Sequence, residues 1–109
     1  MQARQYDPST VMTITGEVTS VHDVGYQGVH LLVQTDQETV EVHLGPNWYL
    51  EAAGFTVATG DRIEVTGSRI DQSGTPNLIA AQVKSGDQVL ILRDANGLPM
   101  WRGRGQSAR

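Results

Sequence analysis

A single short helix is expected between two strands in residues 39–67, and this arrangement restricts the fold more than any other feature of the chain. Residues 39–44 (TVEVHL) alternate polar and apolar side chains, which is typical of a strand with one buried face. Pro46 then ends the strand, because proline has no N–H for a sheet ladder and fits the first turn of a helix. The pattern predicts a two-turn helix over residues 47–53, and alternation resumes at Ile63.

The rest of the chain reads as further strands joined by glycine-containing turns. Strands are predicted over residues 10–24, 29–34 and 76–83, where β-branched and apolar residues recur between turn signals. Residues 89–92 form another apolar run, and residues 98–101 are expected to fold back on it after an Asp-Ala-Asn-Gly turn. The chain is therefore all-β apart from its one helix.

The alternation also predicts which side chains form the core. Gly16 within the first strand is expected to mark a bulge or a sharp bend. Trp48 and Leu50 on the helix are expected to close one end of the core. The residues predicted to be largely buried are Met12, Ile14, Val18, Leu31, Val33, Val40, Val42, Leu44, Ile63, Val65 and Leu78.

With 109 residues, 39% of them hydrophobic, the chain is expected to form one domain. We expect a flexible N-terminal arm over residues 1–9, the domain over residues 10–102 and a flexible basic tail over residues 103–109. There is no cysteine, which excludes disulfides and thiolate metal sites. No run approaches the length of a membrane span, and residues 1–5 show no signal-peptide pattern.

The order of these elements resembles the oligonucleotide/oligosaccharide-binding fold, or OB-fold. Residues 14–18 (ITGEV) and 60–67 (GDRIEVTG) look like the first and fourth strands of such domains, and the resemblance covers residues 10–83. It implies a small five-stranded Greek-key barrel with one short helix between strands three and four, here with a C-terminal β-hairpin extension. More narrowly, the chain is similar to small bacterial OB-fold proteins, many of them exported. The resemblance alone suggests a periplasmic or other exported location.

The usual ligand face of this fold gives the candidate binding residues. On that face we expect a site that includes Tyr26, His30, Glu41, His43 and Arg69. Single-stranded nucleic acid is one alternative ligand, since OB-folds bind it with exposed aromatic and basic residues. The net charge of −4 disfavours that alternative, because phosphate backbones repel an acidic surface.

Metal binding is a second alternative. Periplasmic copper chaperones with an OB-like barrel use histidine, methionine and tryptophan, and imidazole is a good ligand for copper. His30 and His43 could be cross-strand neighbours, but a pair alone is an incomplete site, whereas His22 lies at the end of the first strand. We therefore expect no metal site and no cofactor, and we keep His30 and His43 as weak candidates.

The sequence contains no Ser/His/Asp set and no phosphate-binding glycine loop, so we expect no enzyme. The leading hypothesis is a non-catalytic binding module for an unknown protein or small ligand. Met100, Trp101 and Arg102 are candidate interaction residues, because these types are enriched at interfaces. The same segment is more simply expected to fold onto its own barrel. A homo-oligomer that pairs exposed strand edges remains open.

Overall fold

The computed structural model describes residues 6–23, 28–72 and 74–101. Their strands and helices closely follow the predicted bounds. In chain order the elements are η2 (Pro8–Thr10), β1 (Val11–Asp23), β2 (Val29–Gln34), β3 (Thr39–His43), α1 (Asn47–Ala52), β4 (Arg62–Gln72), β5 (Thr75–Ser85) and β6 (Gln88–Ile91).

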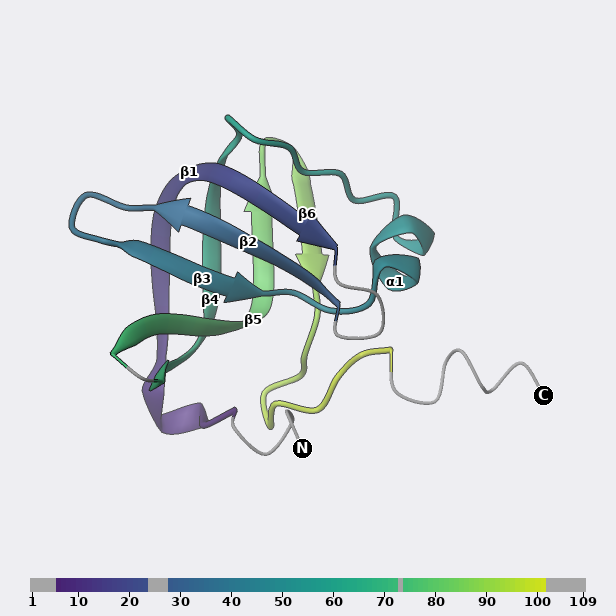
Figure 1. The fold of residues 1–109 in the computed structure, drawn as a ribbon. Coiled ribbons are helices and arrows are strands. Elements are labelled where there is room, and N and C mark those ends of the chain that lie inside the picture. The colour runs from purple at the N-terminus through teal and green to yellow at the C-terminus, as the bar shows by residue number, and fades with distance from the viewer. Residues whose placement is uncertain (1–5, 24–27, 73, 102–109) are drawn as a thin grey trace.

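Five of these strands close into a barrel with OB-like topology, which confirms the predicted fold class. The sheet order is β3-β2-β1-β4-β5-β6, and β3 also pairs with β5 in parallel. That parallel pairing covers only residues 41–43 and 77–79, and this short contact closes the barrel. Figure 1 shows β2, β3 and the second half of β1 crossing in front of β4, β6 and the second half of β5.

The long first strand pairs with two neighbouring strands along its length. Its first half pairs with β4 and its second half with β2, and Figure 1 shows the curve between them. Gly16 lies at this change of partner, where a Cβ would be 2.8 Å from Cγ1 of Val33 and closer still to the carbonyl oxygen of Gln34. The bulge itself falls three residues later, between Val18 and Ser20. Gly16 therefore permits a close backbone approach, and the bulge then adjusts the register.

The barrel interior contains the predicted core with two exceptions. All the residues expected there are buried except Met12 and Ile14. Ile14 is half-buried and packs against the core. Met12 is 37% exposed, so its predicted burial is wrong. It lies near the start of β1 and faces Gly67, which has no side chain to cover it.

The helix α1 closes one end of the barrel with Tyr49 and Leu50, both buried. The Tyr49 hydroxyl donates to the carbonyl oxygen of Ile91 at 2.9 Å and so ties the helix to β6. Trp48 is 46% exposed, and its predicted place in the barrel end is wrong. Adjacent residues on a helix point about 100° apart, so Tyr49 and Leu50 can both face the core while Trp48 points outward.

The extension after the barrel is a reduced form of the predicted hairpin. The strand β6 pairs with β5, and the chain then turns at Gly97, whose φ is +86°. The returning segment makes a single bridge between Arg93 and Pro99, and the Met100 N–H donates to the carbonyl oxygen of Leu92. Met100 and Trp101 pack against the core.

The described part of the expected N-terminal arm lies against the same extension. Tyr6 is 9% exposed, and its ring occupies the space where a side chain at residue 97 would be. Asp7 caps the short helix η2 by accepting from the Ser9 N–H. The domain limits remain predictions. None of the described helices has the length and hydropathy needed to cross a bilayer.

Candidate functional site

The strands β2 and β3 bring two histidines and one glutamate together on the outer face of the barrel. Val29, Leu31 and Val33 point inward along β2, as do Val40 and Val42 along β3. Side chains alternate between the two faces of a strand, so the intervening residues point outward.

The register places the outward residues side by side. His30 is directly opposite His43, as the sequence suggested, and Glu41 lies two residues before His43 on the same face of β3. Cross-strand neighbours on one face have Cβ atoms roughly 5 Å apart, which is within reach of an imidazole.

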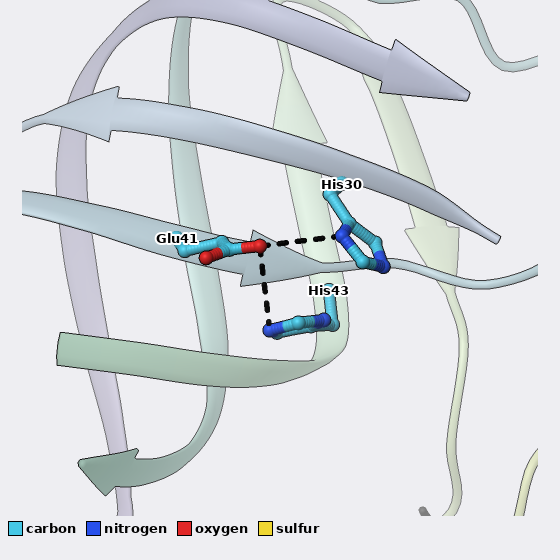
Figure 2. A group of neighbouring side chains, drawn as sticks. All are labelled: His30, Glu41 and His43. Carbon is cyan, nitrogen blue, oxygen red and sulfur yellow. Dashed lines mark ion pairs between the residues drawn. The ribbon is translucent and has the colours of Figure 1, made fainter. Parts of the chain in front are cut away.

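The three side chains converge on one carboxylate oxygen. Oε2 of Glu41 lies 3.3 Å from Nδ1 of His30 and 4.0 Å from Nε2 of His43. Figure 2 shows this oxygen between the two rings. The ring centroids are 4.3 Å apart with an interplanar angle of 63°. All three side chains are half-buried, so the cluster is accessible from solvent without being fully hydrated.

Asn77 of β5 completes the surroundings of the cluster. Its Nδ2 donates to the carbonyl oxygen of Thr75, so its Oδ1 faces Nε2 of His43, 2.7 Å away. An amide oxygen can only accept, and His43 therefore carries its proton on Nε2 in this arrangement. Asn77 was not among the site residues predicted from the sequence. The only signal was a polar residue directly before the apolar run of residues 78–81.

This donor set fits a divalent transition-metal ion. Ligand atoms about 2.1 Å from a metal lie roughly 3.0–3.5 Å from one another. The 3.3 Å separation of His30 and Glu41 falls in this range, and a small rotation of His43 would shorten the 4.0 Å separation. One ligand atom from each of these three residues lies within 4.8 Å of the other two. If Nε2 of His43 bound the ion, the proton now donated to Asn77 would move to Nδ1 of the same ring, and Oδ1 of Asn77 would be an additional oxygen donor.

A third histidine lies next to the cluster. His22 of β1 is the register partner of His30, so His22, His30 and His43 form a row across β1, β2 and β3. His22 is exposed and lies near the end of its strand. His22 was expected to lie apart from the other two histidines at the end of its strand, whereas the register makes it a neighbour of His30.

The comparisons with known proteins give the family and the fold. The MamS/MamX magnetosome protein family matches residues 10–90, which include all five barrel strands and all but the last residue of the additional strand β6. The chain belongs to this family. No curated protein matches it.

Among solved structures, this MamS/MamX family member is similar to a Leishmania major Friedlin chain assigned as an aspartyl-tRNA synthetase. The TM-score is 0.54 and the identity 11%, over 69% of this chain and 17% of that one. At this identity the likeness shows the barrel fold alone, and it spans only a small part of the synthetase.

Arg69 does not join the cluster in the MamS/MamX family member. Its Nη1 and Nη2 donate to the two carboxylate oxygens of Glu38, at 2.6 and 3.3 Å, and its Nε donates to Asp71. The hydrogen bonds from Arg69 lower the pKa of Glu38. Arg69 thus connects β4 to the β2–β3 turn, and its role in ligand binding stays a prediction.

The remaining candidates lie elsewhere. Tyr26 and Arg102 are outside the described residues. Trp101 packs over Gly45, where a Cβ would be 2.8 Å from its ring, and lies 5.6 Å from the Tyr49 ring. Met100 and Trp101 thus contact the barrel of the MamS/MamX family member itself, which is the simpler of the two expectations, and their role in binding a partner stays a prediction.

Proposed function

We propose that this MamS/MamX family member is a non-catalytic binding module that holds a divalent transition-metal ion at His30, Glu41 and His43. The observation that supports this most is the convergence of two imidazoles on one carboxylate oxygen, with separations of 3.3 and 4.0 Å. The three residues come from two adjacent strands of a closed barrel. The strands hold the backbone of these residues in place before any ion binds.

The donor types narrow the choice of ion. Two imidazoles and a carboxylate suit Zn²⁺, Cu²⁺, Ni²⁺ or Fe²⁺, whereas Cu(I) prefers sulfur ligands and Mg²⁺ prefers oxygen alone. The proposal therefore departs from the copper-chaperone comparison, which needed methionine. Nucleic acid is a weaker proposal, because Glu41 would add a negative charge at the centre of the expected binding face.

Isothermal titration of the purified chain with Zn²⁺, Cu²⁺ and Ni²⁺, with Mg²⁺ as the control ion, tests the proposal. We expect one site, and we expect His30→Ala, His43→Ala and Glu41→Gln each to weaken binding at least ~10–100-fold. Glu17→Gln is the matched control, because Glu17 is an exposed glutamate on the neighbouring strand β1.

Thermal melts of the same variants provide an independent test of metal binding. At ~100 times its dissociation constant, an ion that binds only the folded chain stabilises it by about 2.7 kcal/mol. Equal affinities for the chain and for His43→Ala would refute the site, as would an equal loss in Glu17→Gln and Glu41→Gln.

A further inference from the structure

A cavity of about 390 Å³ lies on the outer face of the barrel, between the N-terminal segment and the turn after β6. Its floor includes Thr66, Gln82 and Ile91, which are successive register partners across β4, β5 and β6. Tyr6 and Arg93 form part of its walls. The volume falls within the range of small-molecule sites, and the cavity is broadly open to solvent.

Arg93 is a buried cation beside this cavity. The residue is 8% exposed, and its guanidinium carbon lies 5.9 Å from the Tyr6 ring centroid and 5.4 Å from that of Trp101. Nη1 donates to the carbonyl oxygen of Gly97 at 2.9 Å, whereas Nε has no acceptor. The Nε–H of Arg93 is therefore a buried donor without an acceptor among the described residues.

The charge of Arg93 has no counter-ion among the described residues. The neighbouring carboxylate, Asp94, accepts from the backbone N–H groups of Asn96 and Leu98 and forms no ion pair with Arg93. The two aromatic rings hold the guanidinium and attract it, but they do not neutralise it. Burial lowers the pKa of Arg93, as expected for a charge removed from water. An uncompensated buried charge is costly, so a site for an anion is the arrangement that would offset it.

The other lining residues restrict the ligand further. Pro8, Val11, Ala81, Ile91 and Ala95 make much of the wall apolar, and Val11 and Ile91 are more than 40% exposed although they are large hydrophobic residues. Asp94 also lines the cavity and repels a multiply charged anion. A single arginine is matched by one negative charge, and its planar fork fits a carboxylate.

We propose that this cavity binds a monocarboxylate that bears a small aliphatic group, with the carboxylate on Arg93 and the aliphatic group against Val11 and Ile91. Two sources share this chemistry: a free carboxylic acid and the C-terminal carboxylate of a peptide. The site is separate from the His30–Glu41–His43 cluster and does not depend on the proposed metal function.

Titrations followed by ¹H–¹⁵N NMR in metal-free buffer test this proposal, with the Nε–H signal of Arg93 as the local probe. The probes are isovalerate, its neutral analogue isovaleramide, inorganic phosphate, and a short peptide that ends in valine with either a free or an amidated C-terminus. We expect isovalerate to shift the Arg93 signal in a saturable manner and isovaleramide to leave it unchanged.

Two variants of β6 provide a matched pair. Ile91→Glu places a carboxylate in the cavity wall and is expected to weaken isovalerate binding about tenfold or more, by repulsion or by occupying Arg93 itself. Val89→Glu adds the same charge to the same strand at a 57% exposed position that does not line the cavity, and binding should be kept. Both positions are exposed, so both variants should fold.

The possible results separate clearly. Tighter binding of the free-ended peptide than of isovalerate would assign the site to a chain terminus, and the reverse order would assign it to a free acid. An equal response to isovaleramide, tighter binding of phosphate, or unchanged isovalerate binding in Ile91→Glu would overturn the proposal. The absence of a saturable shift with any carboxylate would overturn it as well.

Discussion

Nε2 of His43 and Oδ1 of Asn77 lie 2.7 Å apart, across the parallel pairing that closes the barrel. The asparagine is 5% exposed, and the orientation of its amide is fixed because Nδ2 donates a hydrogen bond to the carbonyl oxygen of Thr75. A neutral oxygen donor therefore lies beside a candidate metal ligand and is held in place by its own second hydrogen bond.

Asn77→Asp should raise the affinity for Zn²⁺ roughly tenfold. The substitution puts a charged oxygen where the amide oxygen lies, and added ligand charge tightens a cation site. Isothermal titration measures the change, and Asn77→Ser serves as the uncharged control, which should not bind more tightly than the parent chain. An unchanged affinity in Asn77→Asp would show that residue 77 does not reach the ion.

Glu38→Gln should remove part of the acid sensitivity of the fold. Arg69 lowers the pKa of Glu38 in the folded chain, so this carboxylate stabilises the fold at pH values above its unfolded pKa, about 4.3. That contribution is lost as the pH falls through the lower, folded pKa. Melting temperatures between pH 7 and pH 2 should therefore fall less steeply for Glu38→Gln than for the parent chain.

Glu51→Gln is the control for this measurement, because Glu51 is an exposed residue of α1. Its melting profile should follow that of the parent chain. If the two variants gave the same profile, the Glu38–Arg69 pair would make no specific contribution to acid stability.

Gly16→Ala should destabilise the fold by about 1–3 kcal/mol, the usual cost of forcing an atom into a packed site. A Cβ at this position would be 2.8 Å from Cγ1 of Val33 and would overlap the carbonyl group of Gln34. Urea denaturation measures the difference. The adjacent exposed residue gives the control, Thr15→Ala, which should change the stability by under about 1 kcal/mol.

Val42→Ala should cost on the order of 2–4 kcal/mol, because Val42 is fully buried and its loss would leave a cavity in the barrel. The same substitution at Val89, which is 57% exposed, provides the comparison within one residue type and should be nearly neutral. A loss below half a kcal/mol for Val42→Ala in denaturant melts would contradict its place in the core.

The barrel could be predicted from the sequence because its signals are local. Alternation along residues 39–44 and the proline at residue 46 depend only on neighbouring residues, and both were realised in β3 and α1. The wrong predictions concern which side chains face the core. Trp48, Tyr49 and Leu50 are consecutive apolar residues on a short helix, so their order does not reveal which of them faces the core. Met12 follows the inward alternation, but it is exposed because its partner across the sheet is Gly67.

The candidate site was only partly predictable for a related reason. The pairing of His30 with His43 follows from the short β2–β3 connection, which sets the register. The approach of Asn77 depends on the parallel pairing of β3 with β5, two strands that are separated along the chain by the helix and β4. Long-range pairing of this kind has no signature in the sequence of either strand. The buried Arg93 was missed because its surroundings come from both ends of the chain.

Because the β3–β5 pairing is only three residues long, opening of the barrel at this pairing should depend on whether the proposed metal site is occupied. This three-residue contact is the only strand pairing within the described barrel that runs in parallel, and Glu41, His43 and Asn77 all belong to it. An ion bound there would link β3 to β5, and opening of the barrel at this pairing would release the ion. Amide hydrogen exchange at residues 41–43 and 77–79 should then slow when the ion binds, before any change is seen in β6.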